Sequence, residues 1–255
     1  MSNSPDILIL TDLDDSLFST LRKIPASQQP GKTLAASAAA GKNSYMTRKQ
    51  QAMVNWMDLS RCVPVTARST EAYSRVTLPF AGPAAILANG AVMLNRNGTV
   101  NEEWASIVNS ILSSQQDAIH GVVDTLKSIA ARHAMNIRSW AVIEPSCDAV
   151  YAVAKSNTST HGEDLLIIAD ELKSHLNTDD FQMKDAWQFH RNANNLSVTP
   201  KGISKAIATE YLLEKIRSEK AVLTVGVGDS ASDLGFMRLC DVWLTPTRSQ
   251  IDQLL

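Results

Sequence analysis

The stretch that decides the fold is ILILTDLDDSL, residues 7–17, near the start of the chain. Its first four residues are all apolar, which is typical of a strand buried on both faces of a parallel sheet. Three carboxylates follow within four positions, at Asp12, Asp14 and Asp15. Parallel sheets bind their ligands just beyond the carboxyl ends of their strands. The stretch therefore predicts a parallel sheet with an acidic site at the end of its first strand.

Three further apolar runs repeat this arrangement of a buried strand followed by polar residues. Helical patterns separate them, and Thr47 and Ser204 can each cap a helix. Strands that alternate with helices of this length form βαβ units, so we predict an α/β fold. The three runs are residues 62–65 before Thr66, residues 84–87 before Asn89, and residues 221–225 before Gly228 and Asp229.

The middle of the chain breaks this alternation, because helical patterns follow one another there, and so do strand-like runs. Such an order favours a small α+β domain inserted into the parallel one. We expect a core formed by residues 1–95 and 194–255, and an inserted domain formed by residues 96–193. Within the inserted domain we expect helices over residues 102–115, 117–135 and 163–176, and strands over residues 140–144, 149–154 and near 187–189.

Composition and charge exclude several classes of protein. The 255 residues are 44% hydrophobic and include 24 Lys and Arg against 26 Asp and Glu, for a formal net charge of −2. A chain of this kind buries a core and has no global attraction to nucleic acid or to an anionic membrane. The three distant cysteines predict neither a disulfide framework nor a zinc cluster. The apolar run at residues 7–10 is too short for a signal sequence or a membrane span, so we expect a soluble cytoplasmic protein, monomeric or homodimeric.

One segment departs from this balance. No acidic residue occurs from Ser16 to Met57. Its basic residues form either a solvated surface or a basic flap that attracts an anionic substrate to an acidic site. Its Ala- and Ser-rich part, residues 32–41, predicts a loop. The basic residues are Arg22, Lys23, Lys32, Lys42, Arg48 and Lys49.

The polar residues that follow the strands suit phosphoryl transfer. Carboxylates gathered at one edge of a sheet repel one another unless a cation lies among them. Oxygen ligands with room for water and a phosphate oxygen favour Mg²⁺ over zinc. Lys205, near the start of a predicted helix, can add a fixed positive charge. A carboxylate nucleophile, a second carboxylate that moves protons, a metal ion and a lysine then form one coherent set.

The order and spacing of four motifs resemble those of the haloacid dehalogenase-like (HAD) phosphatase superfamily. Residues 7–17 are similar to its strand followed by DxDx[TS], and residues 63–66, VPVT, to its second motif. Lys205 matches its Lys motif, and residues 228–233, GDSASD, match its GDxxxD motif. Residues 88–91, ANGA, are similar to the turn before the C2-type cap in the type IIB branch, which is Cof-like and sucrose-phosphate-phosphatase-like.

The resemblance implies a Rossmann-like parallel core with an inserted C2-type cap. It also implies Mg²⁺-dependent hydrolysis of a small phosphomonoester, such as a phosphosugar, through an aspartyl-phosphate. Asp12 would be the nucleophile and Asp14 the general acid and base, while Thr66 and Lys205 would hold the phosphoryl group. The implied metal ligands are Asp12, the backbone carbonyl of Asp14, and Asp229, with Asp233 in support. The candidate substrate contacts are Arg68, Asn89, Arg191 and Asn192.

Two positions depart from the family pattern, and two other functions stay open. Asp15 stands where many relatives have Gly, and Ser232 where Asn is common. Lys201 competes with Lys205 for the Lys motif, and we prefer Lys205 because the lysine of relatives follows a Pro-x-Gly turn and opens the helix. The same aspartyl-phosphate could serve a phosphotransferase or phosphomutase. A non-catalytic protein that binds a phosphorylated metabolite is the other alternative.

Overall fold

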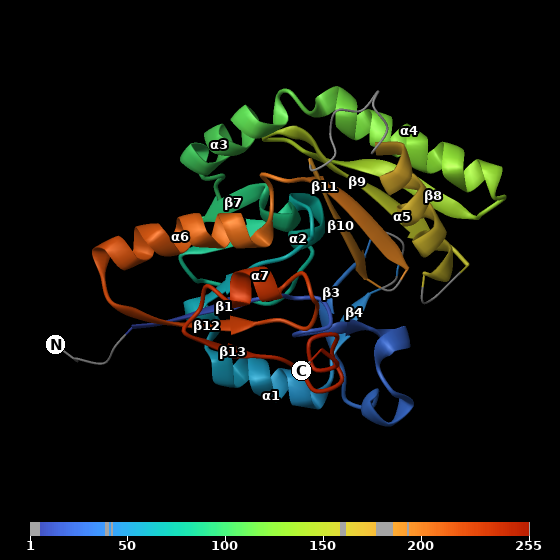
Figure 1. Cartoon of the computed structure of the whole chain (residues 1–255). Coiled ribbons are helices and arrows are strands. Elements are labelled where there is room, and N and C mark those ends of the chain that lie inside the picture. Colours follow the sequence, from blue (N-terminus) through green and yellow to red (C-terminus); the bar gives the residue numbers. More distant parts are fainter. Residues whose placement is uncertain are drawn as a thin grey trace. The chain divides into compact units, whose positions relative to one another are not determined.

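The computed structural model describes residues 6–38, 41, 43–158, 162–176, 186–192 and 194–254. The chain divides into two compact units (Figure 1). The core unit is formed by Met1–Asn101 and Lys205–Leu255, and the inserted unit by Glu102–Ser204. Both boundaries lie later in the chain than those expected after residues 95 and 193.

The core unit contains a four-stranded parallel sheet in the order β13–β12–β1–β5. Strand β1 (Asp6–Thr11) pairs with β12 (Val222–Val227) on one side and with β5 (Cys62–Pro64) on the other. Strand β13 (Val242–Leu244) extends the sheet beyond β12. The middle of β1 is buried on both faces, as its unbroken apolar run predicts.

The apolar run at residues 84–87 was expected as a further parallel strand, and the structure confirms this only in part. It forms β6 (Ala84–Leu87), which pairs antiparallel with β7 (Val92–Asn95) in a separate two-stranded sheet. A tight turn at residues 88–91 returns the chain along β6. Strand β6 also lies beside the end of β5, through a parallel bridge between Val65 and Ile86 in which the Thr66 N–H donates to the Ile86 carbonyl at 2.9 Å.

The two predicted helix caps, Thr47 and Ser204, each directly precede a helix of the core unit. Helix α1 (Arg48–Met57) has a capping box, in which the Thr47 hydroxyl accepts the Gln50 N–H and the Gln50 side chain accepts the Thr47 N–H. The further α-helices described in the core unit are α2 (Thr70–Tyr73), α6 (Lys205–Glu219) and α7 (Leu234–Met237).

The segment without acidic residues folds as a small antiparallel sheet in the order β2–β4–β3. The strands are β2 (Ser19–Thr20), β3 (Thr33–Ala36) and β4 (Ser44–Met46), so the loop predicted for residues 32–41 is wrong over β3. The reason is burial, because Ala35 and Ala36 pack into the core cluster that contains Leu13 and Phe18. Lys42 lies outside the described residues.

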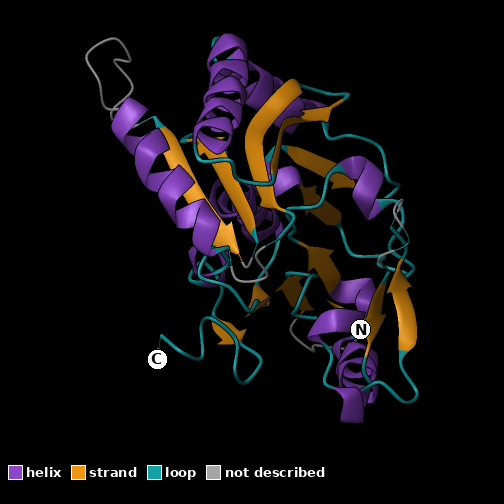
Figure 2. Ribbon diagram, turned by 90° about the vertical axis from the view of Figure 1, so that its right-hand side faces the viewer, coloured by secondary structure: helices purple, strands orange, loops and turns teal. Residues whose placement is uncertain are grey.

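The inserted unit is an antiparallel sheet, ordered β10–β11–β9–β8, with α4 and α5 packed against it (Figure 2). Strand β11 pairs with both β9 and β10, and for this reason the unit extends past residue 193. No helix in the described part of the chain is long and apolar enough to cross a membrane. The elements are α3 (Glu102–Leu112), α4 (Gln116–Arg132), β8 (Ile137–Glu144), β9 (Asp148–Ser156), α5 (Glu163–Leu176), β10 (Trp187–Asn192) and β11 (Asn195–Pro200).

Candidate active site

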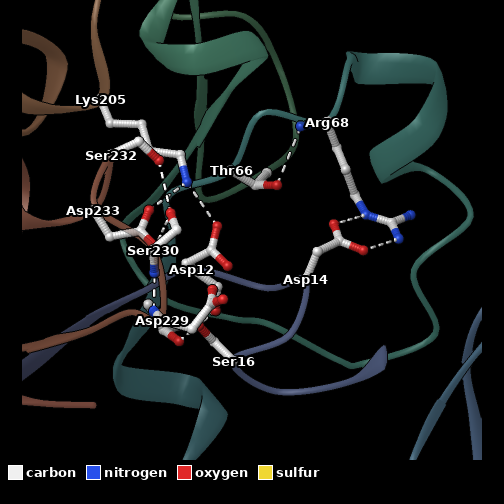
Figure 3. A network of polar contacts seen from close by, with 11 residues as sticks. Asp12, Asp14, Ser16, Thr66, Arg68, Lys205, Asp229, Ser230, Ser232 and Asp233 are labelled. Atoms are coloured by element: carbon white, nitrogen blue, oxygen red, sulfur yellow. Dashed lines mark hydrogen bonds and ion pairs between the residues drawn. The ribbon is translucent and has the colours of Figure 1, made fainter. Parts of the chain in front are cut away.

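The carboxyl ends of β1 and β12 bring three aspartates together (Figure 3). Asp12 directly follows β1, and its N–H donates to the carbonyl of Val227, the last residue of β12, at 2.8 Å. Asp229 and Asp233 lie in the loop after β12. One carboxylate oxygen from each of the three lies within 4.8 Å of the others, and all three residues are buried. The structure thus places side by side the three residues whose side chains are predicted metal ligands.

Lys205, the first residue of α6, contacts two of these carboxylates. Its Nζ lies 2.6 Å from Oδ1 of Asp12 and 2.8 Å from Oδ1 of Asp233. Burial lowers the pKa of Lys205, but the two carboxylates outweigh burial and hold that pKa above its usual value. The ammonium group therefore stays charged. Lys201, the competing candidate, lies exposed in the turn after β11.

Asp233 is held in place by the loop that precedes it. Its Oδ2 accepts hydrogen bonds from the Ser230 hydroxyl at 2.8 Å, the Ser230 N–H at 3.0 Å and the Asp229 N–H at 3.2 Å. Although burial raises the pKa of Asp233, Lys205 and these hydrogen bonds hold it below its usual value. Ser232, which stands where Asn is common, places its Oγ 2.8 Å from that of Ser230. The loop therefore fixes one carboxylate that stays ionised.

Negative charge is in excess at the other two carboxylates. Burial, together with Asp233 and Asp229, holds the pKa of Asp12 well above its usual value despite Lys205. Burial and the charge of Asp233 also raise the pKa of Asp229 to about 7, although the Ser16 hydroxyl donates to it at 3.2 Å. A cluster of carboxylate oxygens with an uncompensated charge fits a hard divalent cation such as Mg²⁺.

The side chain of Asp14 points away from Asp12 and toward Arg68 (Figure 3). Its two oxygens accept hydrogen bonds from Nε and Nη2 of Arg68 at 2.7 and 2.8 Å. Burial lowers the pKa of Arg68, but the paired carboxylate outweighs it and raises that pKa. Arg68 also lies over the ring of Phe18, with 5.1 Å between the guanidinium carbon and the ring centre. The predicted acid and base and a candidate substrate contact are thus paired with each other.

Thr66, Arg68 and Asn89 belong to one group of loops in the core unit. The Thr66 hydroxyl, which is buried, accepts the N–H of Arg68 at 3.1 Å. Asn89 lies in the turn after β6 with a φ of +57°, and its N–H donates to the Thr66 carbonyl at 3.1 Å. Asn89 therefore has a structural role in this turn. Arg191 and Asn192 lie on β10 of the inserted unit, and their assignment to substrate stays a prediction.

The structure adds residues that the sequence analysis did not assign to the site. Ser16 and Ser230 orient Asp229 and Asp233 through the hydrogen bonds described above. Ser16 could have been assigned to the site from the sequence, because it occupies the last position of the DxDx[TS] motif. The sequence gives less reason to assign Ser230 to the site, because serine next to aspartate is common in turns in general.

Solved structures share the fold of this chain. The C-terminal domain of the trehalose-6-phosphate phosphatase of C. albicans matches with a TM-score of 0.60 and 16% identity, over 92% of this chain and 74% of that one. The Synechocystis sucrose-phosphatase, solved with sucrose and phosphate, matches with a TM-score of 0.53 and 14% identity, over 98% and 86%. An IMP-bound mutant of the Plasmodium falciparum IMP-nucleotidase matches with a TM-score of 0.58 and 11% identity, over 99% and 67%.

The chain has the HAD-like fold. This confirms the predicted class, a Rossmann-like parallel core with an inserted α+β unit. No family model matches the chain, and no curated protein matches its sequence. Because the identities to these structures are only 11–16%, the likeness shows the fold alone.

Proposed function

We propose that the chain is a metal-dependent phosphatase that hydrolyses a small phosphomonoester through an aspartyl-phosphate on Asp12. The observation that supports this most directly is the position of Asp12. Its carboxylate lies 2.6 Å from the Lys205 ammonium and within 4.8 Å of Asp229 and Asp233, at the carboxyl end of β1. A nucleophile, a fixed positive charge and a set of metal ligands thus share one place on a HAD-like fold.

Asp12, Asp229 and the backbone carbonyl of Asp14 would hold the metal ion, with Asp233 in support. When bound, the ion supplies positive charge to the phosphoryl oxygens. An Asp12 oxygen attacks phosphorus, and the bond from phosphorus to the ester oxygen breaks. Lys205 stabilises the negative charge on the phosphoryl group, because its own charge is maintained by Asp12 and Asp233.

Asp14 donates a proton to the departing alcohol and then accepts one from the water that attacks the aspartyl-phosphate. This step releases phosphate and restores the carboxylate of Asp12. In the structure both oxygens of Asp14 are occupied by Arg68. The carboxylate must therefore separate from Arg68 before it can carry a proton. We propose that the phosphate of the substrate competes for Arg68 and so frees Asp14.

The proposed substrate is a phosphosugar or a related small metabolite. Two of the structures with the same fold are phosphatases named for trehalose 6-phosphate and for sucrose phosphate, and a third is bound to IMP. Because these names refer to different compounds, several substrates have to be tested and not one alone. Because the fold is shared at low identity, the panel has to include sugar phosphates and nucleoside monophosphates.

The test is release of inorganic phosphate by the EDTA-treated chain, with Mg²⁺ added back, from p-nitrophenyl phosphate, phosphosugars and IMP. We expect hydrolysis only with the metal. Asp12→Asn, which keeps the shape of the side chain but removes the nucleophile, should abolish it. Lys201→Met is the matched control for Lys205→Met and should retain activity. Activity that survives Asp12→Asn, or phosphate transferred only to an added alcohol, would refute the proposed hydrolysis.

A further inference from the structure

Asp15 has a backbone conformation that is unfavourable for most residues with a side chain. Its φ is +68°, in the left-handed region, and its N–H donates to the Phe18 carbonyl at 2.7 Å to close the turn after Asp14. Glycine adopts this conformation without strain, whereas aspartate only tolerates it. The conformation leaves open what the carboxylate of Asp15 adds.

The carboxylate of Asp15 acts on the aspartate cluster. Asp15 directly precedes Ser16, whose hydroxyl donates a hydrogen bond to Oδ1 of Asp229 at 3.2 Å, so the turn places Asp15 next to the cluster. Its charge is one of those that act on Asp229. On its other side Asp15 forms an ion pair with Lys23, at the end of the 3-10 helix Leu21–Lys23. The Asp15 side chain is only 20% exposed, so this charge is partly shielded from water.

The charges around the cluster then fit one divalent cation. The four carboxylates of Asp12, Asp15, Asp229 and Asp233 face the two ammonium groups of Lys205 and Lys23. Two negative charges remain, which a single Mg²⁺ would neutralise. Asp15 and Lys23 have opposite charges and leave this net charge unchanged. Each of them alone, however, changes the electrostatic potential at the metal site.

We propose that Asp15 and Lys23 set the affinity of the metal site, Asp15 by adding a fourth carboxylate beside Asp229 and Lys23 by offsetting its charge. The inference rests on the metal-dependent function proposed above. Asp15 acts here as a positioning residue for the cation and not as a catalytic residue.

Lys23 is the residue of the basic segment that contacts a carboxylate next to the site. Lys32 instead lies over the ring of Tyr45, with 5.5 Å from its Nζ to the ring centre. The guanidinium of Arg48 lies so close to Gly31 that a Cβ there would be 2.4 Å from its Nε. The contacts of Lys32 and Arg48 fit a surface role, whereas the contact of Lys23 connects the segment to the aspartate cluster.

The test is direct binding of Mg²⁺ to the EDTA-treated full chain, by calorimetry and by the rise in Tm with added metal, at fixed pH and ionic strength. Asp15→Asn should weaken binding roughly tenfold, as expected for the loss of a unit charge near a divalent cation at a partly buried site. Lys23→Met should strengthen it by a similar factor. Lys49→Met removes another exposed lysine of the same segment and is the matched control, with unchanged affinity.

A second variant separates charge from backbone strain. Asp15→Gly removes the same charge but suits a φ of +68°, so it should weaken Mg²⁺ binding as Asp15→Asn does while the metal-free chain becomes more stable. Wild-type affinity in both Asp15 variants would overturn the inference, as would a Lys49→Met effect equal to that of Lys23→Met. Failure of the wild-type chain to bind Mg²⁺ would instead overturn the proposed metal-dependent function.

Discussion

Removing the charge of Asp229 should change how the stability of the metal-free chain depends on pH. Asp229 is 8% exposed, and burial with the charge of Asp233 raises its pKa from 3.8 to about 7. A carboxyl group with a raised pKa favours the folded state while it is protonated, and this contribution is lost as pH rises toward the folded pKa. Between pH 5 and pH 8 the wild-type chain should therefore lose about 2.5 kcal/mol of stability through this one group.

The assay is urea denaturation in EDTA at pH 5, 6, 7 and 8, for the wild type and for Asp229→Asn. The variant cannot ionise at this position, so its stability relative to the wild type should rise by about 2.5 kcal/mol across this range. Asp12 also has a raised pKa, but it is present in both proteins and cancels to first order in the difference. Parallel pH curves for the two proteins would refute the reasoning. Saturating Mg²⁺ should stabilise the wild type and not the variant.

Three further changes test the packing and charges of the core unit. Lys205→Met leaves buried carboxylates without their cation and should destabilise the metal-free chain by about 3–5 kcal/mol in urea denaturation. Gly228→Ala places a Cβ 2.5 Å from that of Asp233, and should lower the Tm together with Mg²⁺ affinity because the loop must shift. Thr47→Ala removes the acceptor for the Gln50 N–H and should cost about 1 kcal/mol, measured as a lower Tm with unchanged Mg²⁺ affinity.

The sequence predicted those elements whose pattern of apolar residues is regular along their length. Strand β1 is apolar at every middle position because both of its faces are covered, and α5 (Glu163–Leu176) has the predicted bounds. Strand β3 could not be predicted, because four residues that include two alanines show no alternation. The run at residues 84–87 looked like a further parallel strand. Its partner depends on the turn at Asn89, whose direction the composition of the strand does not encode.

The aspartate cluster could be predicted in part for a different reason. The carboxyl ends of parallel strands meet at one edge, so Asp12 and Asp229 were expected at the same edge of the sheet. Their contact follows from the direct pairing of β1 with β12. The partner of Asp14 could not be predicted in the same way. Arg68 lies 54 positions away along the chain, and both a substrate contact and an ion pair fit its position. In the structure Arg68 forms the ion pair, and its contacts with the Ala72 carbonyl and the Phe18 ring, which help to direct its side chain, depend on tertiary packing.

Four positions at which this chain departs from the preferences of ordinary residues lie at or next to the same cluster. Asp12, Asp229 and Asp233 bury charge, and Asp15 takes a left-handed conformation. The raised pKa of Asp229 alone corresponds to about 4 kcal/mol at pH 8, a large share of the 5–15 kcal/mol by which domains are stable. A bound cation removes this penalty and adds its own binding energy to the folded state. Metal affinity and folding stability of the core unit are therefore coupled, and a mutation that changes one at this cluster should change the other.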